Sequence, residues 1–142
     1  MIGLLVVTHG RLAEELVNAV RTIVHAVDAL EAVSIGWDVE VAEATRHIEE
    51  AVRRVDRGAG VLILTDMFGG TPTNLGLSLY EHGRIEIVTG VNLPMLVKFA
   101  NLRDDLELHE VARRIASQGR DAIQVASSFL DEKGRPGRDS TA

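Results

Sequence analysis

Residues 61–65 read Val-Leu-Ile-Leu-Thr, and a polar, glycine-rich turn follows at once, Asp66-Met67-Phe68-Gly69-Gly70-Thr71-Pro72. An uninterrupted apolar run of this length, with Gly58-Ala59-Gly60 before it, is typical of a strand that is buried on both faces. Such a strand needs covering layers above and below it. The run therefore predicts an α/β domain with a largely parallel sheet.

Strand-like and helix-like segments alternate on both sides of this run. Three further strands are predicted, at Ile2 to Thr8, Ala32 to Trp37 and Arg84 to Thr89. Helices are predicted where apolar residues recur three and four positions apart. These helices cover Arg11 to Ala26, Val41 to Val55, Thr73 to His82, Asn92 to Leu102 and Leu106 to Ser117. The order predicts a doubly wound, mostly parallel sheet with helices on both faces. The first and third strands are the most apolar, which predicts that they are central neighbours.

The end of the chain differs from the rest. Ala122 to Ala126 reads as a last short strand, whereas residues 131–142 contain almost nothing to bury. We predict one domain over residues 1–130 and a polar, disordered tail over residues 131–142. A chain of 142 residues with 46 % hydrophobic and 25 % charged residues can bury a single core without covalent staples.

Composition limits the classes of function. Fifteen basic and 21 acidic residues give a net charge of −6, which argues against a general nucleic-acid binder. The absence of cysteine excludes disulfides and thiolate metal sites and suits a reducing compartment. No apolar run has the length of a membrane span, and no signal-peptide pattern follows Met1. A cytoplasmic protein is predicted, connected to a membrane only through other subunits.

Chemistry-bearing residues follow two of the predicted strands. His9 comes after the first strand and Asp66 after the third, so both leave the same edge of the sheet. Adjacent strands lie about 4.8 Å apart, which brings the two side chains within reach of one hydrogen bond. A carboxylate that holds one ring nitrogen of histidine leaves the other free as a nucleophile. We predict that His9 and Asp66 are the catalytic pair, with His9 carrying a phosphoryl group.

The turns around this pair suit an anion. Gly10, Gly69, Gly70 and Thr71 are predicted to bind the phosphoryl group. Gly10 precedes a predicted helix start, so free backbone amides would point toward the ring, and Gly69 and Gly70 permit close backbone approach beside the hydroxyl of Thr71. Thr71 is predicted as helix cap, with Pro72 in the first turn. Asp66 capping that helix is an open alternative.

Three further residues are candidates for contact with a partner. They are Met67, Phe68 and Asn92. For Met67 and Phe68 the alternative is a place in the core, and for Asn92 it is a cap of its own helix. Signals for a Walker loop or a dinucleotide fingerprint are missing from the sequence, so no metal and no nucleotide cofactor is predicted.

The sequence resembles the mannose-type enzyme IIA domain of the bacterial phosphoenolpyruvate-dependent sugar phosphotransferase system. The resemblance covers roughly residues 1–128 and rests on L-L-V-V-T-H-G, V-L-I-L-T-D-M-F-G-G-T-P-T-N and I-V-T-G-V-N-L-P-M-L. It implies that His9 accepts a phosphoryl group from the histidine phosphocarrier protein and passes it to a IIB component for sugar uptake. Asp66 would orient His9, and Thr71 with the turn amides would line the phosphoryl pocket.

The resemblance also implies an assembly. Family members are homodimers in which an antiparallel last strand is exchanged between subunits, and residues 122–126 would be that strand. The family often has Trp at the position of Phe68 and Ser at that of Thr71. The short polar end predicts a IIB component on a separate chain.

Two alternative functions remain at this stage. One is a regulatory protein whose His9 phosphorylation state controls its binding to a target protein. The other is the phosphotransfer subunit of dihydroxyacetone kinase, which resembles the same fold but usually lacks the turn from Asp66 to Pro72.

Overall fold

The computed structural model describes residues 1–25, 27–67 and 69–133. Its centre is a four-stranded parallel sheet in the order β2-β1-β3-β4. The strands are β1 (Gly3–His9), β2 (Leu30–Ile35), β3 (Val61–Thr65) and β4 (Ile85–Thr89). The first and third strands are central neighbours, as predicted, and the chain winds outward from them in both directions.

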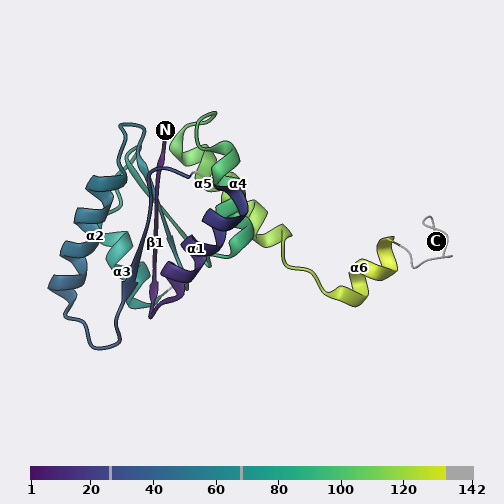
Figure 1. Ribbon diagram of the computed structural model, residues 1–142, viewed down its shortest axis with the longest axis horizontal. Helices are drawn as coiled ribbons and strands as arrows, with labels where there is room; N and C mark the ends of the chain where they lie inside the picture. Colours follow the sequence, from purple (N-terminus) through teal and green to yellow (C-terminus); the bar gives the residue numbers. More distant parts are fainter. Residues whose placement is uncertain (26, 68, 134–142) are drawn as a thin grey trace.

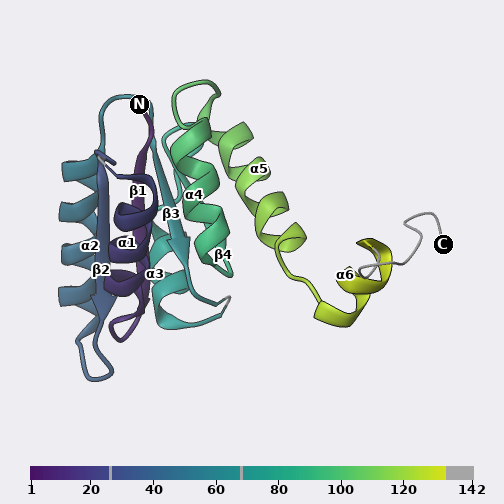
Figure 2. The same cartoon turned by 45° about the vertical axis from the view of Figure 1, so that its right-hand side comes forward.

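Helices cover both faces of the sheet (Figures 1 and 2). One face carries α1 (Leu12–Val24), α4 (Leu93–Leu102) and α5 (Leu108–Asp121), and the other carries α2 (Val41–Val55) and α3 (Thr71–Ser78). Each strand contributes side chains to the core on both faces of the sheet, because successive side chains point to opposite faces. In β3, Leu62 and Leu64 pack under the first layer, whereas Val61 and Ile63 pack under the second.

The amphipathic spacing of the helices explains their placement. In α2 the buried residues are Ala44, Ile48, Ala51 and Val55, which recur at three- and four-residue steps. Arg103, which follows the last residue of α4, is buried. It binds backbone carbonyls that precede the first residues of β1 and β2. Its guanidinium donates to the carbonyls of Ile2, Asp28 and Ala29. Burial lowers the pKa of Arg103 below its ordinary value.

Several boundaries differ from the predictions. The second strand ends at Ile35, so Gly36 and Trp37 lie beyond it. The third helix begins at Thr71 and ends at Ser78, earlier than His82. The fifth helix extends to Asp121 instead of Ser117. Ala26, the predicted end of the first helix, lies outside the described residues.

The predicted last strand is wrong for this chain. Residues 122–125 form neither helix nor strand, and Ala126 begins α6 (Ala126–Lys133). In the part of the chain that the structure describes, the sheet of the single chain has four strands, all parallel. Ile123 and Val125, the larger apolar residues of the predicted strand, are exposed, at 75 % and 66 %. A strand needs a neighbouring strand for its backbone hydrogen bonds, and none lies beside these residues in the single chain.

Helix α6 projects away from the helix–sheet layers in Figures 1 and 2. It extends through Lys133, three residues into the segment predicted as a disordered tail, and residues 134–142 lie outside the described residues. Across 1–25, 27–67 and 69–133, each helix is too short or too polar to cross a bilayer.

Candidate functional site

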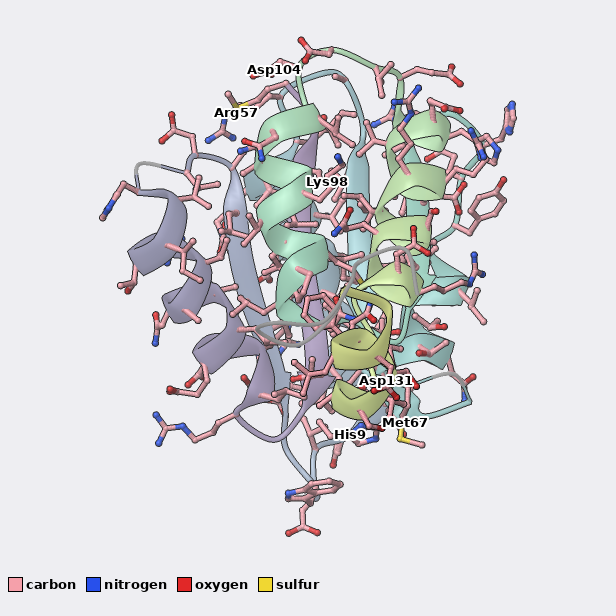
Figure 3. All side chains as sticks on the ribbon, turned by 90° about the vertical axis from the view of Figure 1, so that its right-hand side faces the viewer. His9, Arg57, Met67, Lys98, Asp104 and Asp131 are labelled. Carbon is pink, nitrogen blue, oxygen red and sulfur yellow. The ribbon has the colours of Figure 1, made fainter. Side chains whose placement is uncertain are left out.

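The strand register brings His9 and Asp66 together. Val7 pairs with Thr65 between the parallel strands β1 and β3, so these two strands end side by side. His9 is the last residue of β1, and Asp66 follows the last residue of β3. Figure 3 shows His9 and Met67 at one end of the molecule, with Arg57 and Asp104 at the other. The site therefore lies beyond the carboxyl ends of the strands, where parallel sheets bind ligands.

The carboxylate of Asp66 holds His9 at two points. Oδ2 accepts a hydrogen bond from Nδ1 of His9 at 2.8 Å and another from the His9 backbone amide at 3.0 Å. Oδ1 accepts from the amide of Met67 at 3.0 Å. Because an ionised carboxylate can only accept, the ring proton resides on Nδ1 and the lone pair on Nε2. The alternative for Asp66, a cap of α3, is not what the structure shows.

The surroundings of Asp66 favour its ionised form. Burial is the largest single influence and raises the pKa of Asp66. The hydrogen bonds from the ring and amide of His9, together with the charge of His9, outweigh burial and lower that pKa below the ordinary value. The side chains of His9 and Asp66 are 22 % and 14 % exposed, so the pair is shielded but reachable.

Gly70 lies against the free edge of the imidazole. A Cβ at Gly70 would come within 2.7 Å of Cε1 and 3.2 Å of Nε2 of His9. Its φ of −85° is one that any residue adopts, so space rather than backbone conformation requires glycine. The missing side chain leaves room beside Nε2 of His9.

A buried hydroxyl chain fixes the turn that carries Asp66. The hydroxyl of Thr65 donates to Oγ1 of Thr73 at 2.5 Å, and Thr73 donates to the carbonyl of Met67 at 2.6 Å. Thr65 and Thr73 are fully buried. Sequence analysis missed Thr73, although a threonine directly after the Thr71-Pro72 helix entry was a usable signal.

Thr8 connects His9 to the helix that follows. Its Oγ1 accepts a hydrogen bond from the Ala13 amide at 2.7 Å and donates to the His9 carbonyl at 3.2 Å. It thereby satisfies one of the amides that the first turn of α1 leaves unpaired. This bond fixes the chain on the C-terminal side of the imidazole.

The structure corrects two expectations about the glycine turns. The Gly10 amide is not free, because it donates to the carbonyl of Ile35 at 2.9 Å. Gly10 instead allows the sharp turn into α1 through its φ of +55°. Thr71 is the first residue of α3 and not its cap, since Gly70 occupies the cap position. Gly69 has a φ of +86° and borders open space.

Trp37 is a second residue that sequence analysis missed. Its indole stacks on the His9 imidazole, with ring centroids 5.3 Å apart and planes inclined by 21°. The sequence analysis placed Trp37 at the end of a strand. The usable signal was a lone tryptophan at the same edge of the sheet as His9.

The three candidate partner contacts differ in their surroundings. Met67 is exposed beside His9, and Phe68 lies outside the described residues. Asn92 is the cap of α4, where its Oδ1 accepts from the Met95 amide and its Nδ2 donates to the Gly119 carbonyl. Contact of these residues with a partner stays a prediction.

Comparison with known proteins gives the family. The sequence model of the family described as PTS system fructose IIA component, EIIA-man, matches residues 3–116, which include His9 and the turn from Asp66 to Thr71. The chain belongs to this family. The resemblance seen in the sequence is therefore confirmed, and the chain is a IIA component of the mannose type.

The names of two curated relatives of this IIA chain each specify a sugar. The fructose-specific EIIA component of Bacillus subtilis is 31 % identical over 98 residues, which are 68 % of this chain and 66 % of that protein. The mannose-specific EIIAB component of Escherichia coli K12 is 28 % identical over 142 aligned positions, covering 95 % of this chain and 42 % of the relative. The matched region thus spans just under two thirds of one relative and under half of the other.

A solved structure agrees in fold. It is the PTS IIA protein associated with the fucose utilization operon from Streptococcus pneumoniae, with a TM-score of 0.80 and 25 % identity. The match covers 91 % of this IIA chain and 96 % of that one. The agreement extends over nearly the whole described fold.

Proposed function

We propose that this IIA chain is a phosphoryl carrier of the sugar phosphotransferase system, with Nε2 of His9 as the acceptor atom. The histidine phosphocarrier protein is the donor, and a IIB component is the recipient on the way to sugar uptake in the cytoplasm. The observation that carries the proposal is the 2.8 Å hydrogen bond from Nδ1 of His9 to Asp66, which leaves the Nε2 edge facing Gly70.

The transfer itself is a simple exchange between two imidazoles. The lone pair of Nε2 forms a bond to phosphorus, while the P–N bond of the donor breaks and its electron pair returns to the donor ring. The proton on Nδ1 stays in place, so His9 becomes a phosphorylated imidazolium whose positive charge faces Asp66. Transfer to a IIB component reverses these bonds and restores neutral His9.

Positioning and charge stabilisation are what the protein supplies for this reaction. Asp66 stabilises the imidazolium, and the amides of Gly69, Gly70 and Thr71, near the start of α3, suit the oxygens of the transferring group. The exposed hydroxyl of Thr71 is a further donor at the same end of α3. Gly10 contributes through the turn that it permits instead of through its own amide.

We further propose a homodimer that uses the open side of the sheet. β4 is one of the two edge strands, and a hollow of about 500 Å³ lies beside it, lined by residues that include Ile87, Met95 and Ile123. The apolar side chains of Ile123, Val125 and Phe129 are exposed in the single chain. Covering them in a second copy would remove apolar surface from water. Sedimentation of wild type and Ile123→Asp tests this, with a shift toward monomer expected in the variant.

The direct test of the carrier function is a phosphoryl-transfer assay. Labelled phosphoenolpyruvate, enzyme I and the histidine phosphocarrier protein are mixed with wild type, His9→Gln or His47→Gln. His47 is an exposed histidine on α2 and serves as the matched control. We expect label on wild type and His47→Gln but none on His9→Gln, followed by transfer to an added IIB component. Label that remains on His9 in the presence of IIB components would favour the regulatory alternative.

A further inference from the structure

Trp37 occupies an unusual position for the one tryptophan of this chain. It is 79 % exposed, although its indole is the largest apolar side chain in the sequence. Core packing therefore does not account for it. Its indole stacks on the ring of His9. His9 lies opposite Ile35 in the β1–β2 register, and Ile35 lies two residues before Trp37 in the sequence.

The indole completes the set of contacts that fix the imidazole. Asp66 holds Nδ1, Gly70 lies against the Cε1 and Nε2 edge, and Trp37 covers a ring face at a plane angle of 21°. Gly10 is adjacent to this stack without being required by it, because a Cβ there would lie 3.8 Å from Cζ2 and Nε1 of Trp37, an ordinary van der Waals contact. Rotation of the imidazole out of its plane would lose both the stack and the bond to Asp66.

The stack has an electrostatic consequence that depends on the state of His9. The face of an indole carries negative charge density and attracts a cation placed over it. Neutral His9 gains little from this attraction. A phosphorylated His9 that keeps its Nδ1 proton is an imidazolium, and it then lies between the Asp66 carboxylate at its edge and the indole at its face.

We propose that Trp37 is a positioning residue for phosphoryl transfer, which stacks on His9 and stabilises the phosphorylated imidazolium. This inference rests on the proposed function, because it requires His9 to be the phosphoryl acceptor. Its chemical basis is the difference between the two states of the ring. The indole stabilises the cation more than the neutral imidazole, so it favours retention of the phosphoryl group.

Spontaneous hydrolysis of the phosphorylated protein measures this stabilisation. Water attacks phosphorus, the P–Nε2 bond breaks, and its electron pair returns to the ring, which becomes neutral with its proton on Nδ1 and releases dihydrogen phosphate. The attraction to Trp37 is lost along this path. Removal of the indole should therefore accelerate hydrolysis by about two- to fivefold, the range that cation–π energies at exposed sites imply.

The experiment compares wild type with Trp37→Phe and Trp37→Leu after phosphorylation by the phosphocarrier and removal of the donor. Phe keeps an aromatic face, whereas Leu keeps apolar volume without one. We expect the half-life of phosphorylated His9 to fall in the order wild type, Phe, Leu. Because Trp37 is the only tryptophan, its fluorescence in wild type should also change on phosphorylation and stay constant in His9→Gln.

The outcomes separate this inference from the proposed function. Equal half-lives in wild type and Trp37→Leu, with label on His9, would overturn the role of Trp37 and leave the carrier function intact. Equal shortening in Phe and Leu would also overturn it, since apolar packing alone would then explain the effect. Absence of label from wild-type His9 would overturn the carrier function itself.

Discussion

Oδ2 of Asp66 accepts hydrogen bonds from both Nδ1 and the backbone amide of His9, at 2.8 Å and 3.0 Å. One oxygen therefore fixes the ring and the chain that carries it. Asp66→Asn would keep an acceptor for one of these bonds but lose the negative charge opposite the imidazolium. We expect phosphoryl acceptance to slow by about 100-fold in this variant.

Rapid-quench kinetics with labelled phosphocarrier protein would measure that rate. Circular dichroism of the variant serves as the control for folding, because the variant is expected to keep the fold and to lose the orientation of the ring. Acceptance at the wild-type rate would contradict the orienting role of Asp66.

The pH dependence of stability gives a second prediction. The pKa of Asp66 is lower in the folded chain than in the unfolded chain, because His9 stabilises its ionised form. A carboxyl group of this kind contributes stability above its unfolded pKa, and that contribution is lost as the pH falls through the folded value.

The measurement is the free energy of unfolding of wild type and Asp66→Asn in urea at about pH 7 and at about pH 3. We expect the advantage of wild type over the variant to be larger at the higher pH. A constant difference between the two pH values would show that Asp66 is not ionised preferentially in the folded state.

Gly70 and Gly69 offer a matched pair of substitutions. In Gly70→Ala the new Cβ would collide with Cε1 of His9, whereas in Gly69→Ala it would meet open space and strain only the backbone. We expect Gly70→Ala to reduce the rate of phosphoryl acceptance by roughly 10- to 100-fold through displacement of the ring. Gly69→Ala should cost about 1 kcal/mol in stability with a smaller effect on the rate. Equal rates for the two variants would argue against a phosphoryl pocket beside Gly70.

Thr73 is expected to stabilise the turn that carries Asp66. Thr73→Val removes a hydroxyl that bonds both Thr65 and the Met67 carbonyl, so it should lower the free energy of unfolding by about 1–3 kcal/mol. Thr71→Val, at an exposed position of the same helix, is the control and should change stability by less than about 0.5 kcal/mol. Chemical denaturation of both variants measures these free energies of unfolding, and equal stabilities would contradict the role of Thr73.

The framework of this fold could be predicted because hydrophobic patterning determines it. The run from Val61 to Thr65 had no polar interruption, and the helix from Val41 to Val55 showed one apolar face, so both were placed correctly. The approach of His9 to Asp66 followed from the parallel sheet, since strands that run in the same direction end at the same edge.

Other features depend on tertiary contacts that no local pattern expresses. Glycine is typical of a helix end, yet α5 continues through Gly119 to Asp121. The missing side chain of Gly119 lets the helix lie against Met95. Residues 122–126 alternate like a strand but have no partner strand in the single chain. The bond from Gly10 to Ile35 and the stack of Trp37 on His9 both join separate segments, and short-range periodicity does not reveal such contacts.

The central claim is that His9 receives the phosphoryl group on Nε2 while Nδ1 keeps its proton and donates it in the hydrogen bond to Asp66. Nitrogen-15 NMR of the histidine rings, recorded before and after phosphorylation by the phosphocarrier protein, measures both points in one sample. We expect the Nε2 resonance of His9 alone to show coupling to phosphorus, with a protonated Nδ1. Phosphorus coupling to Nδ1 of His9, or to any other residue, would contradict the account.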